Sequence, residues 1–296
     1  RDLPTTDWYL VSSPVKDFSV QSYRDSNLID FSAPNFALGY YINDGTAWNY
    51  PISSTTFNMD SGKGFSTKRN SIGNVFFDGE ISATTVNFPI TKGAVNSFNL
   101  VGNPFSAYVS ANSNAGAVVL GSNLLTDNSG ILSEQTIWVW DSQANSGKGE
   151  YTQINNLSDA FYLAPTQGFF VSSNETGGNF TFNTNLVSEQ ITDSFQRSIP
   201  KPKIQLKIRS DNNQEKTTQI YYVSDATLGF DNGYDSSIFG GANLNFSIYT
   251  AFLDSNSNKK LGTQALPQDY ENILVPIGIK SEANNKIIFS AIQENL

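Results

Sequence analysis

The sequence predicts an all-β fold, built as two related sandwich-like lobes followed by an immunoglobulin-like β-sandwich module. Short runs of alternating, β-branched and aromatic residues recur along the 296 residues, and turn residues separate these runs. The first two thirds of the chain also contain an internal duplication. No window shows the 3.6-residue period and the caps of a long helix, so we expect little helix.

The individual strands follow from local pattern. Clear examples are residues 75–77, 180–182, 204–208 and 219–223. Between the strands lie Asn, Asp and Gly residues that tolerate a positive φ, as at 43–45, 177–178 and 231–233. These alternating strands and turns indicate sheets with one buried face.

The duplication rests on four pairs of segments that occur in the same order. Residues 10–15, 41–44, 62–65 and 73–77 are echoed by residues 100–105, 138–141, 166–169 and 178–182. The spacing between partners grows slowly, as loop insertions would make it. Copies of about 100 residues are too long for a solenoid repeat and suit sandwich-like lobes. We therefore expect lobes at residues 1–92 and 93–196.

A third module follows a change in composition. Residues 196–203 contain two prolines and three basic residues, which interrupt the strand pattern and are typical of a linker. Five or six strand-like runs then predict a β module at residues 203–296. Its last run ends almost at the terminus, so we expect the module to be truncated, with a following strand missing.

Short aromatic and glycine motifs carry a resemblance to a known class of protein. They are residues 230–235, 248–250, 261–267 and 275–278, with 100–105, 161–170 and 195–197 upstream. These motifs resemble the C-terminal β-sandwich region that precedes the sorting domain in large secreted proteins of Bacteroidetes, exported by the type IX secretion system. The resemblance implies an extracellular or cell-surface location and contact with the secretion or surface-anchoring machinery. Further strands and a sorting domain normally follow, so it also leads us to expect a fragment or a processed product.

Composition excludes several function classes. The chain has 18 Lys and Arg against 27 Asp and Glu, a net charge of −9, which disfavours nucleic acid as a partner. No run approaches the roughly 18–20 apolar residues that cross a membrane, so we expect no membrane insertion. The absence of His and Cys removes Ser-His-Asp and Cys-His catalysis and the usual zinc ligands.

Paired carboxylates remain as a route to catalysis, as in polysaccharide hydrolases. The candidate pairs are Asp141 with Glu150 and Asp231 with Asp235. Both pairs lie in turn-rich segments, where Asp is common for backbone reasons. We therefore expect that the chain is not an enzyme, and we keep a carboxylate-dependent hydrolase or lyase as the least favoured alternative.

Five aromatic residues form the candidate carbohydrate-binding set: Trp48, Tyr50, Trp138, Trp140 and Tyr151. Flat rings stack on the apolar faces of sugars and lose little entropy in doing so. Two interpretations stay open. The rings fill a sandwich core, or they are exposed and bind a polysaccharide.

Oxygen-bearing residues form two candidate calcium sites. Asp254, Asn256 and Asn258 are spaced two apart, as in calcium loops, although no bidentate Glu follows them. Asp231 and Asp235 form the second candidate site. Turn chemistry is the alternative explanation for both groups, and no other cofactor is expected.

These features favour a non-catalytic accessory or adhesive module of a secreted surface protein, with polysaccharide as its candidate ligand. The alternative is a structural stalk, or a region that the secretion machinery recognises, without a ligand of its own. The solvent exposure of Trp48, Trp138 and Trp140 distinguishes these hypotheses.

Overall fold

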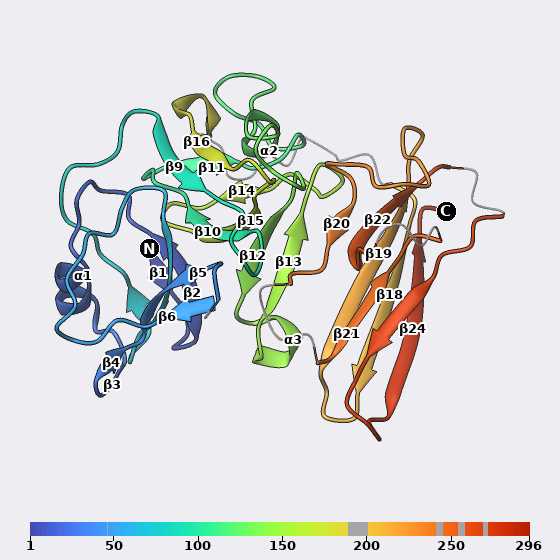
Figure 1. Ribbon diagram of the computed structural model, residues 1–296, viewed down its shortest axis with the longest axis horizontal. Helices are drawn as coiled ribbons and strands as arrows, with labels where there is room; N and C mark the ends of the chain where they lie inside the picture. The colour runs from blue at the N-terminus through green and yellow to red at the C-terminus, as the bar shows by residue number, and fades with distance from the viewer. Residues whose placement is uncertain (46, 189–200, 241–244, 254–257, 269–271) are drawn as a thin grey trace.

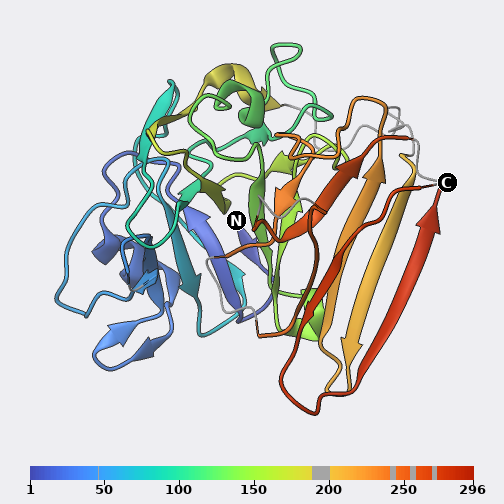
Figure 2. The same ribbon diagram turned by 45° about the vertical axis from the view of Figure 1, so that its right-hand side comes forward.

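The fold is all-β, as predicted. The computed structural model describes residues 1–45, 47–188, 201–240, 245–253, 258–268 and 272–296 (Figure 1). Within these residues the strands form several sheets, and the longest helix, α1 (Val20–Asn27), has 8 residues. The two lobes and the third module lie in a row, with the third module beside the second lobe (Figures 1 and 2).

The first lobe is built on a four-stranded antiparallel sheet in the order β2-β7-β5-β6. Its strands are Trp8–Ser12 (β2), Leu38–Ile42 (β5), Ala47–Asn49 (β6) and Gly64–Lys68 (β7). Two short pairs complete the lobe: Asp2–Leu3 (β1) with Gly73–Asn74 (β8), and Phe31–Ser32 (β3) with Asn35–Phe36 (β4). One face of the sheet and α1 enclose a core that includes Val11, Tyr23, Leu38 and Phe65.

The second lobe is built on a sheet of the same kind, in the order β10-β15-β12-β13. Its strands are Phe98–Gly102 (β10), Ile137–Asp141 (β12), Glu150–Ile154 (β13) and Gly168–Ser172 (β15). Around it lie Val86–Ile90 (β9), Tyr108–Ser110 (β11), Tyr162–Leu163 (β14), Gly178–Phe182 (β16), Val187–Ser188 (β17), and the helices Leu124–Asp127 (α2), Ala144–Gly147 (α3) and Thr184–Leu186 (η1). The core on one face of the sheet includes Val101, Ile137, Phe169 and Phe180.

The strand order of the two sheets agrees with the duplication. β2, β7, β5 and β6 correspond to β10, β15, β12 and β13, and Val11 faces Phe65 in the register as Val101 faces Phe169. The pairing of β5 with β7 corrects one of the sequence matches between the two copies. Because Gly39 pairs with Ser66 and Trp138 pairs with Phe170, Tyr41 corresponds to Trp140 rather than to Trp138.

One asparagine has the same role in each lobe. At the end of α1, Asn27 donates to the carbonyl of Phe76 (2.9 Å) and accepts from its N–H (2.6 Å). After α2, Asn128 makes the same two bonds to Thr181 (3.0 and 2.7 Å). Each side chain therefore ties a helix end to a segment that lies 49 or 53 residues further along the chain.

One strand that the sequence predicts does not form. Residues 180–182 lie in β16, but residues 75–77 follow β8 and are not in a strand. Phe76 and Thr181 bond to their asparagines in the same way, so the difference lies in strand pairing: β16 also pairs with β9, and no described strand pairs with residues 75–77.

The two lobes pack against each other through reciprocal contacts. Ser12 N–H donates to the Thr166 carbonyl and Gly102 N–H donates to the Gly62 carbonyl, both at 2.9 Å. Bridges join Val11 to Gln167 and Val101 to Lys63 in the same reciprocal way. Contacts in which each copy offers the same patch to the other define an approximate twofold relation.

Strand β9 belongs to the second lobe by its pairing, although the expected boundary between the lobes lies after it, at residue 92. It lies within residues 1–92, yet it pairs along its whole length with β16 of the second lobe, in a register that joins Phe88 to Phe180. Its side chains Val86 and Phe88 pack against the core of the second lobe. The chain therefore enters the second lobe before residue 93.

The third module is a single sheet that curls into a sandwich. Within the described residues its order is β23-β21-β22-β19-β18-β24, with β20 pairing to β22. The strands are Lys203–Ser210 (β18), Glu215–Tyr222 (β19), Ser236–Ser237 (β20), Ser247–Thr250 (β21), Leu261–Leu266 (β22), Ile277–Lys280 (β23) and Ile287–Glu294 (β24). β21 contacts β18 although two strands separate them in the order, so the sheet folds over a core that includes Leu206, Ile220 and Ile248. β19 and β22 are parallel, a pairing that the sequence does not indicate.

Residues 231–239 attach the third module to the second lobe. The indole N–H of Trp138 donates to the Ser237 carbonyl (3.0 Å), and Glu134 accepts from the N–H of Ser237 (2.9 Å). The amide of Asn155 donates to the Tyr234 carbonyl (2.6 Å). The expected linker at residues 196–203 lies largely outside the described residues, but Lys201 donates to the carbonyls of the second lobe at residues 156 and 157.

Candidate functional site

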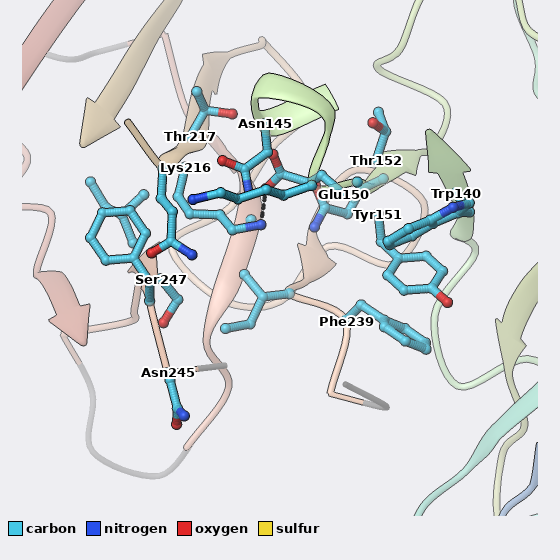
Figure 3. A pocket seen from close by; sticks show the side chains of 18 of the residues that line it. Trp140, Asn145, Glu150, Tyr151, Thr152, Lys216, Thr217, Phe239, Asn245 and Ser247 are labelled. Atoms are coloured by element: carbon cyan, nitrogen blue, oxygen red, sulfur yellow. Dashed lines mark hydrogen bonds and ion pairs between the residues drawn. The ribbon is translucent and has the colours of Figure 1, made fainter. Parts of the chain in front are cut away.

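A cleft of about 600 Å³ lies between the second lobe and the third module (Figure 3). One wall comes from β12, α3 and β13, and the other from β19, β21, β22 and the loops that join the strands of the third module. Its lining includes Trp140, Asn145, Lys148, Glu150, Tyr151, Thr152, Gln153, Gln214, Lys216, Thr217, Phe239, Asn245, Ser247, Glu282 and Asn285. Amide and hydroxyl groups are the commonest in this lining, with the rings of Trp140 and Tyr151 at one end, and Ile238, Phe246 and Ile248 add apolar surface.

The connection between β12 and β13 positions the aromatic end. Asp141 accepts from the N–H groups of Gln143 (2.9 Å) and Ala144 (3.3 Å), which starts the turn of α3. The chain then returns through Gly149, at φ 76°, where a Cβ would lie 2.1 Å from an indole carbon of Trp140. Only glycine allows the backbone to pass this close to the ring.

Trp140 and Tyr151 are cross-strand partners whose ring centroids lie 4.8 Å apart. The indole N–H of Trp140 donates to the carbonyl of Trp8 in the first lobe (2.8 Å), which fixes the plane of the ring. Both side chains are partly buried. Figure 3 shows the two rings together at one end of the cleft, with Phe239 below Tyr151.

An ion pair crosses the cleft at its centre. The Nζ of Lys216 lies 2.8 Å from an Oε of Glu150, and both side chains are mostly shielded from water. Burial raises the pKa of Glu150, and the ammonium of Lys216 opposes that rise. Asn145 of the second lobe also accepts from the N–H of Glu215 (2.7 Å), so the cleft walls are joined at fixed positions.

Trp48, Trp138 and Tyr151 belong to one aromatic cluster, and Tyr50 and Trp140 contact its members. Trp48 and Tyr50 of the first lobe stack on each other (6.4 Å between centroids), and Trp48 lies near Phe170, which also contacts Tyr151. Tyr50 is 37% exposed.

Trp138 differs from the rest of the set, because it is fully buried. It contacts Phe98 (5.1 Å between centroids) and donates to the third module, and its ring has no face open to a ligand. The sequence did not point to Trp8, which is 36% exposed and packs edge-on against Tyr50 (5.6 Å). Trp8 has the position that Phe98 has in the second lobe, and the duplication was the signal that could have identified it.

The candidate calcium ligands are occupied by other contacts or lie outside the described residues. Asp231 accepts from the backbone N–H of Thr227 (2.6 Å), and buried Asp235 accepts from the N–H groups of Asp231 and Ala265 (both 2.7 Å). In the part of the chain that the structure describes, no three acidic side chains come together as a metal-binding group.

The loop candidates can be placed only in part. Asp254 and Asn256 lie outside the described residues, and Asn258 is exposed in the segment before β22.

The two carboxylate pairs proposed for catalysis have structural partners. Asp141 and Glu150 face each other across β12 and β13, but Asp141 accepts from the backbone N–H groups that precede and begin α3, and Glu150 binds Lys216. Asp231 and Asp235 accept from backbone N–H groups, as described above. All four carboxylates therefore hold the chain in place.

The packed sheets and the cleft define an all-β protein with a polar, aromatic-ended groove between two of its parts. The chain belongs to the family described as Domain of unknown function (DUF8693), whose model matches residues 1–292. No curated protein and no solved structure matches the chain. Among the described residues, no helix is both long and apolar enough to span a bilayer.

Proposed function

We propose that this chain is a non-catalytic accessory module of a secreted surface protein and that it binds polysaccharide in the cleft between the second lobe and the third module. The observation that carries the proposal is the cleft itself. About 600 Å³ of space is lined by amides and hydroxyls and ends at the rings of Trp140 and Tyr151. Sugars offer both hydroxyl groups and apolar C–H faces, and this lining complements both.

The charges of the cleft favour a neutral polysaccharide. Lys148 and Lys216 are balanced by Glu150 and Glu282, so the lining has no net formal charge. The chain as a whole carries −9, which repels sulfated and uronic-acid polymers. Neutral glycans are therefore the expected ligands.

Native affinity electrophoresis against a panel of neutral and anionic polysaccharides tests the proposal. Neutral glycans are expected to retard the chain, and Trp140→Ala is expected to abolish the retardation because the ring at the end of the cleft is lost. Gln153→Ala removes one amide of the lining and is expected to weaken binding about tenfold, the equivalent of one good hydrogen bond.

Phe76→Ala is the matched control, because Phe76 is an exposed aromatic residue on the first lobe, outside the cleft lining. This variant should bind as the wild type does. If no neutral glycan retards the wild-type chain, or if Phe76→Ala weakens binding as much as Trp140→Ala, the cleft is not a polysaccharide site.

A structural spacer is the second candidate function. It is favoured by the way the three parts are joined, since aromatic packing and hydrogen bonds fix the third module to the second lobe. Such rigid joints suit a stalk that presents another domain at a set distance. The absence of binding in the electrophoresis experiment would favour this function.

A further inference from the structure

Strand β24 leaves one long edge of the third module open. It pairs with β18 over all eight residues, and no described strand pairs with its other edge. Figures 1 and 2 show it as the outermost strand, beside the C-terminus. An edge of this length exposes a row of backbone N–H and C=O groups that can pair with another strand.

Apolar side chains border this edge on both faces of the sheet. Ile288 and Ile292 on one face are 57% and 49% exposed, and Phe289 on the other is 48% exposed. Native edge strands are usually protected by Lys, by Pro or by a bulge. Residues 287–293 contain no charge and no proline, and their pairing with β18 runs without a bulge.

The sequence of β24 is complementary to itself when two copies run antiparallel. With Ser290 opposite Ser290, Ile288 lies opposite Ile292 and Phe289 lies opposite Ala291. At both ends Lys286 then lies opposite Glu294, whose carboxylate also pairs with Lys203 of β18 in the same copy (3.1 Å), so each Lys286 would join an existing ion pair. Directly opposite residues in antiparallel strands are in side-chain contact, and both apolar and oppositely charged pairs stabilise the ladder.

We propose that the open edge of β24 binds β24 of a second copy of this chain, in antiparallel register about Ser290. The pairing would join two third modules into one continuous sheet and cover Ile288 and Ile292 of each copy with those of the other. It uses a surface separate from the cleft and does not depend on the polysaccharide proposal.

Cysteine cross-linking tests the register directly, because the chain has no Cys of its own. Ser290→Cys places two thiols opposite each other at a Cα separation of about 4.5–5.5 Å, which lies within the range of a disulfide. Gln293→Cys is the matched control, because in this register its thiols are about 20 Å apart. Under mild oxidation the first variant should run as a covalent dimer and the second as a monomer. Equal cross-linking of the two variants would overturn the proposed register.

Sedimentation equilibrium tests the association itself. The wild-type chain should dimerise reversibly. Ile292→Lys should weaken dimerisation at least tenfold, while Leu120→Lys, at an exposed apolar residue of the second lobe, should leave it unchanged. Lys286→Glu should also weaken the dimer, because it places two carboxylates opposite each other at each end of the ladder. A wild-type chain that stays monomeric at every concentration, or a dimer that Ile292→Lys leaves intact, would refute the proposal.

Discussion

At the scale of single residues, Asp235 is the carboxylate with the most unusual environment. It is fully buried, and its oxygens accept from the N–H groups of Asp231 and Ala265, which fixes the loop before β20 to strand β22. Burial raises the pKa of Asp235 to about 7, and the nearby carboxylates of Asp231 and Glu134 add to the rise. Asp235 was a candidate calcium ligand in the sequence, and spacing alone could not show that backbone donors surround it.

The raised pKa of Asp235 predicts a pH-dependent free energy of unfolding. The folded chain holds this proton more tightly than the unfolded chain, whose carboxyl titrates near its ordinary value of 3.8. The stabilisation that the raised pKa adds to the free energy of unfolding is therefore fully present below about pH 4. It is lost progressively as the pH rises to about 7, and the total loss is up to about 4 kcal/mol. Urea unfolding between pH 4 and pH 8 measures it.

The variant Asp235→Asn should flatten this part of the pH profile, because the amide does not titrate. Asp225→Asn, at an exposed residue of the preceding turn, is the control and should keep the wild-type slope. A profile that Asp235→Asn leaves unchanged would show that Asp235 does not titrate in this range.

At the scale of elements, the asparagines at the helix ends join local and distant structure. Asn128 donates to the carbonyl of Leu124 within α2 and bonds twice to Thr181 of β16. Asn27 makes the equivalent bonds in the first lobe. The partner segments are paired in the sequence alignment of the two copies, but the asparagines themselves lie in segments where no match was found.

Asn128→Ala is predicted to lower the free energy of unfolding by about 2–3 kcal/mol. The substitution leaves the N–H and C=O of Thr181 without their side-chain partner at a mostly buried site. Urea denaturation measures the loss. Asn87→Ala removes a bond to the same threonine from an exposed position and should cost less than about 0.5 kcal/mol. Equal losses in the two variants would contradict the role given to Asn128.

Strands were predictable where their pattern is local. The run at residues 204–208 lies in β18, and the run at 219–223 lies in β19 except for its last residue, because alternation reports which face a strand buries. The partners of a strand were not predictable in the same way. β9 looks the same in the sequence whether it pairs within the first lobe or with β16, since the choice depends on contacts far along the chain.

At the scale of the whole molecule, one aromatic cluster joins all three parts. Phe239 of the third module contacts Tyr151 (4.1 Å between centroids), Phe170 (4.6 Å) and Phe98 (4.7 Å) of the second lobe. Tyr41 of the first lobe lies 4.8 Å from Phe170. The fold class and the duplication were predictable from the sequence, but this docking was not, because Phe239 carries no local signal.

Phe239→Ala is predicted to separate the unfolding of the third module from that of the lobes. The loss of a buried Phe costs about 3–5 kcal/mol, and here most of its contacts lie across the joint. Differential scanning calorimetry of the variant should show two transitions. The transition of the third module should lie at a lower temperature than in the wild type, separate from that of the lobes. Phe76→Ala, which removes an exposed ring, should keep the wild-type thermogram. If both variants melt like the wild type, Phe239 does not hold the joint.

The approximate twofold symmetry between the two lobes of one chain has a consequence for how the lobes differ in sequence. In an interface between two identical chains, every substitution occurs on both sides at once, so a bulky residue must be accommodated twice. Joining both copies in one chain removes that constraint. Gly39 in one copy can stand where the other has Trp138, and Ser66 where the other has Phe170. Covalent linkage thus lets the second lobe carry two bulky rings that contact Phe239 of the third module, while Gly39 of the first lobe leaves room for the ring of Tyr50.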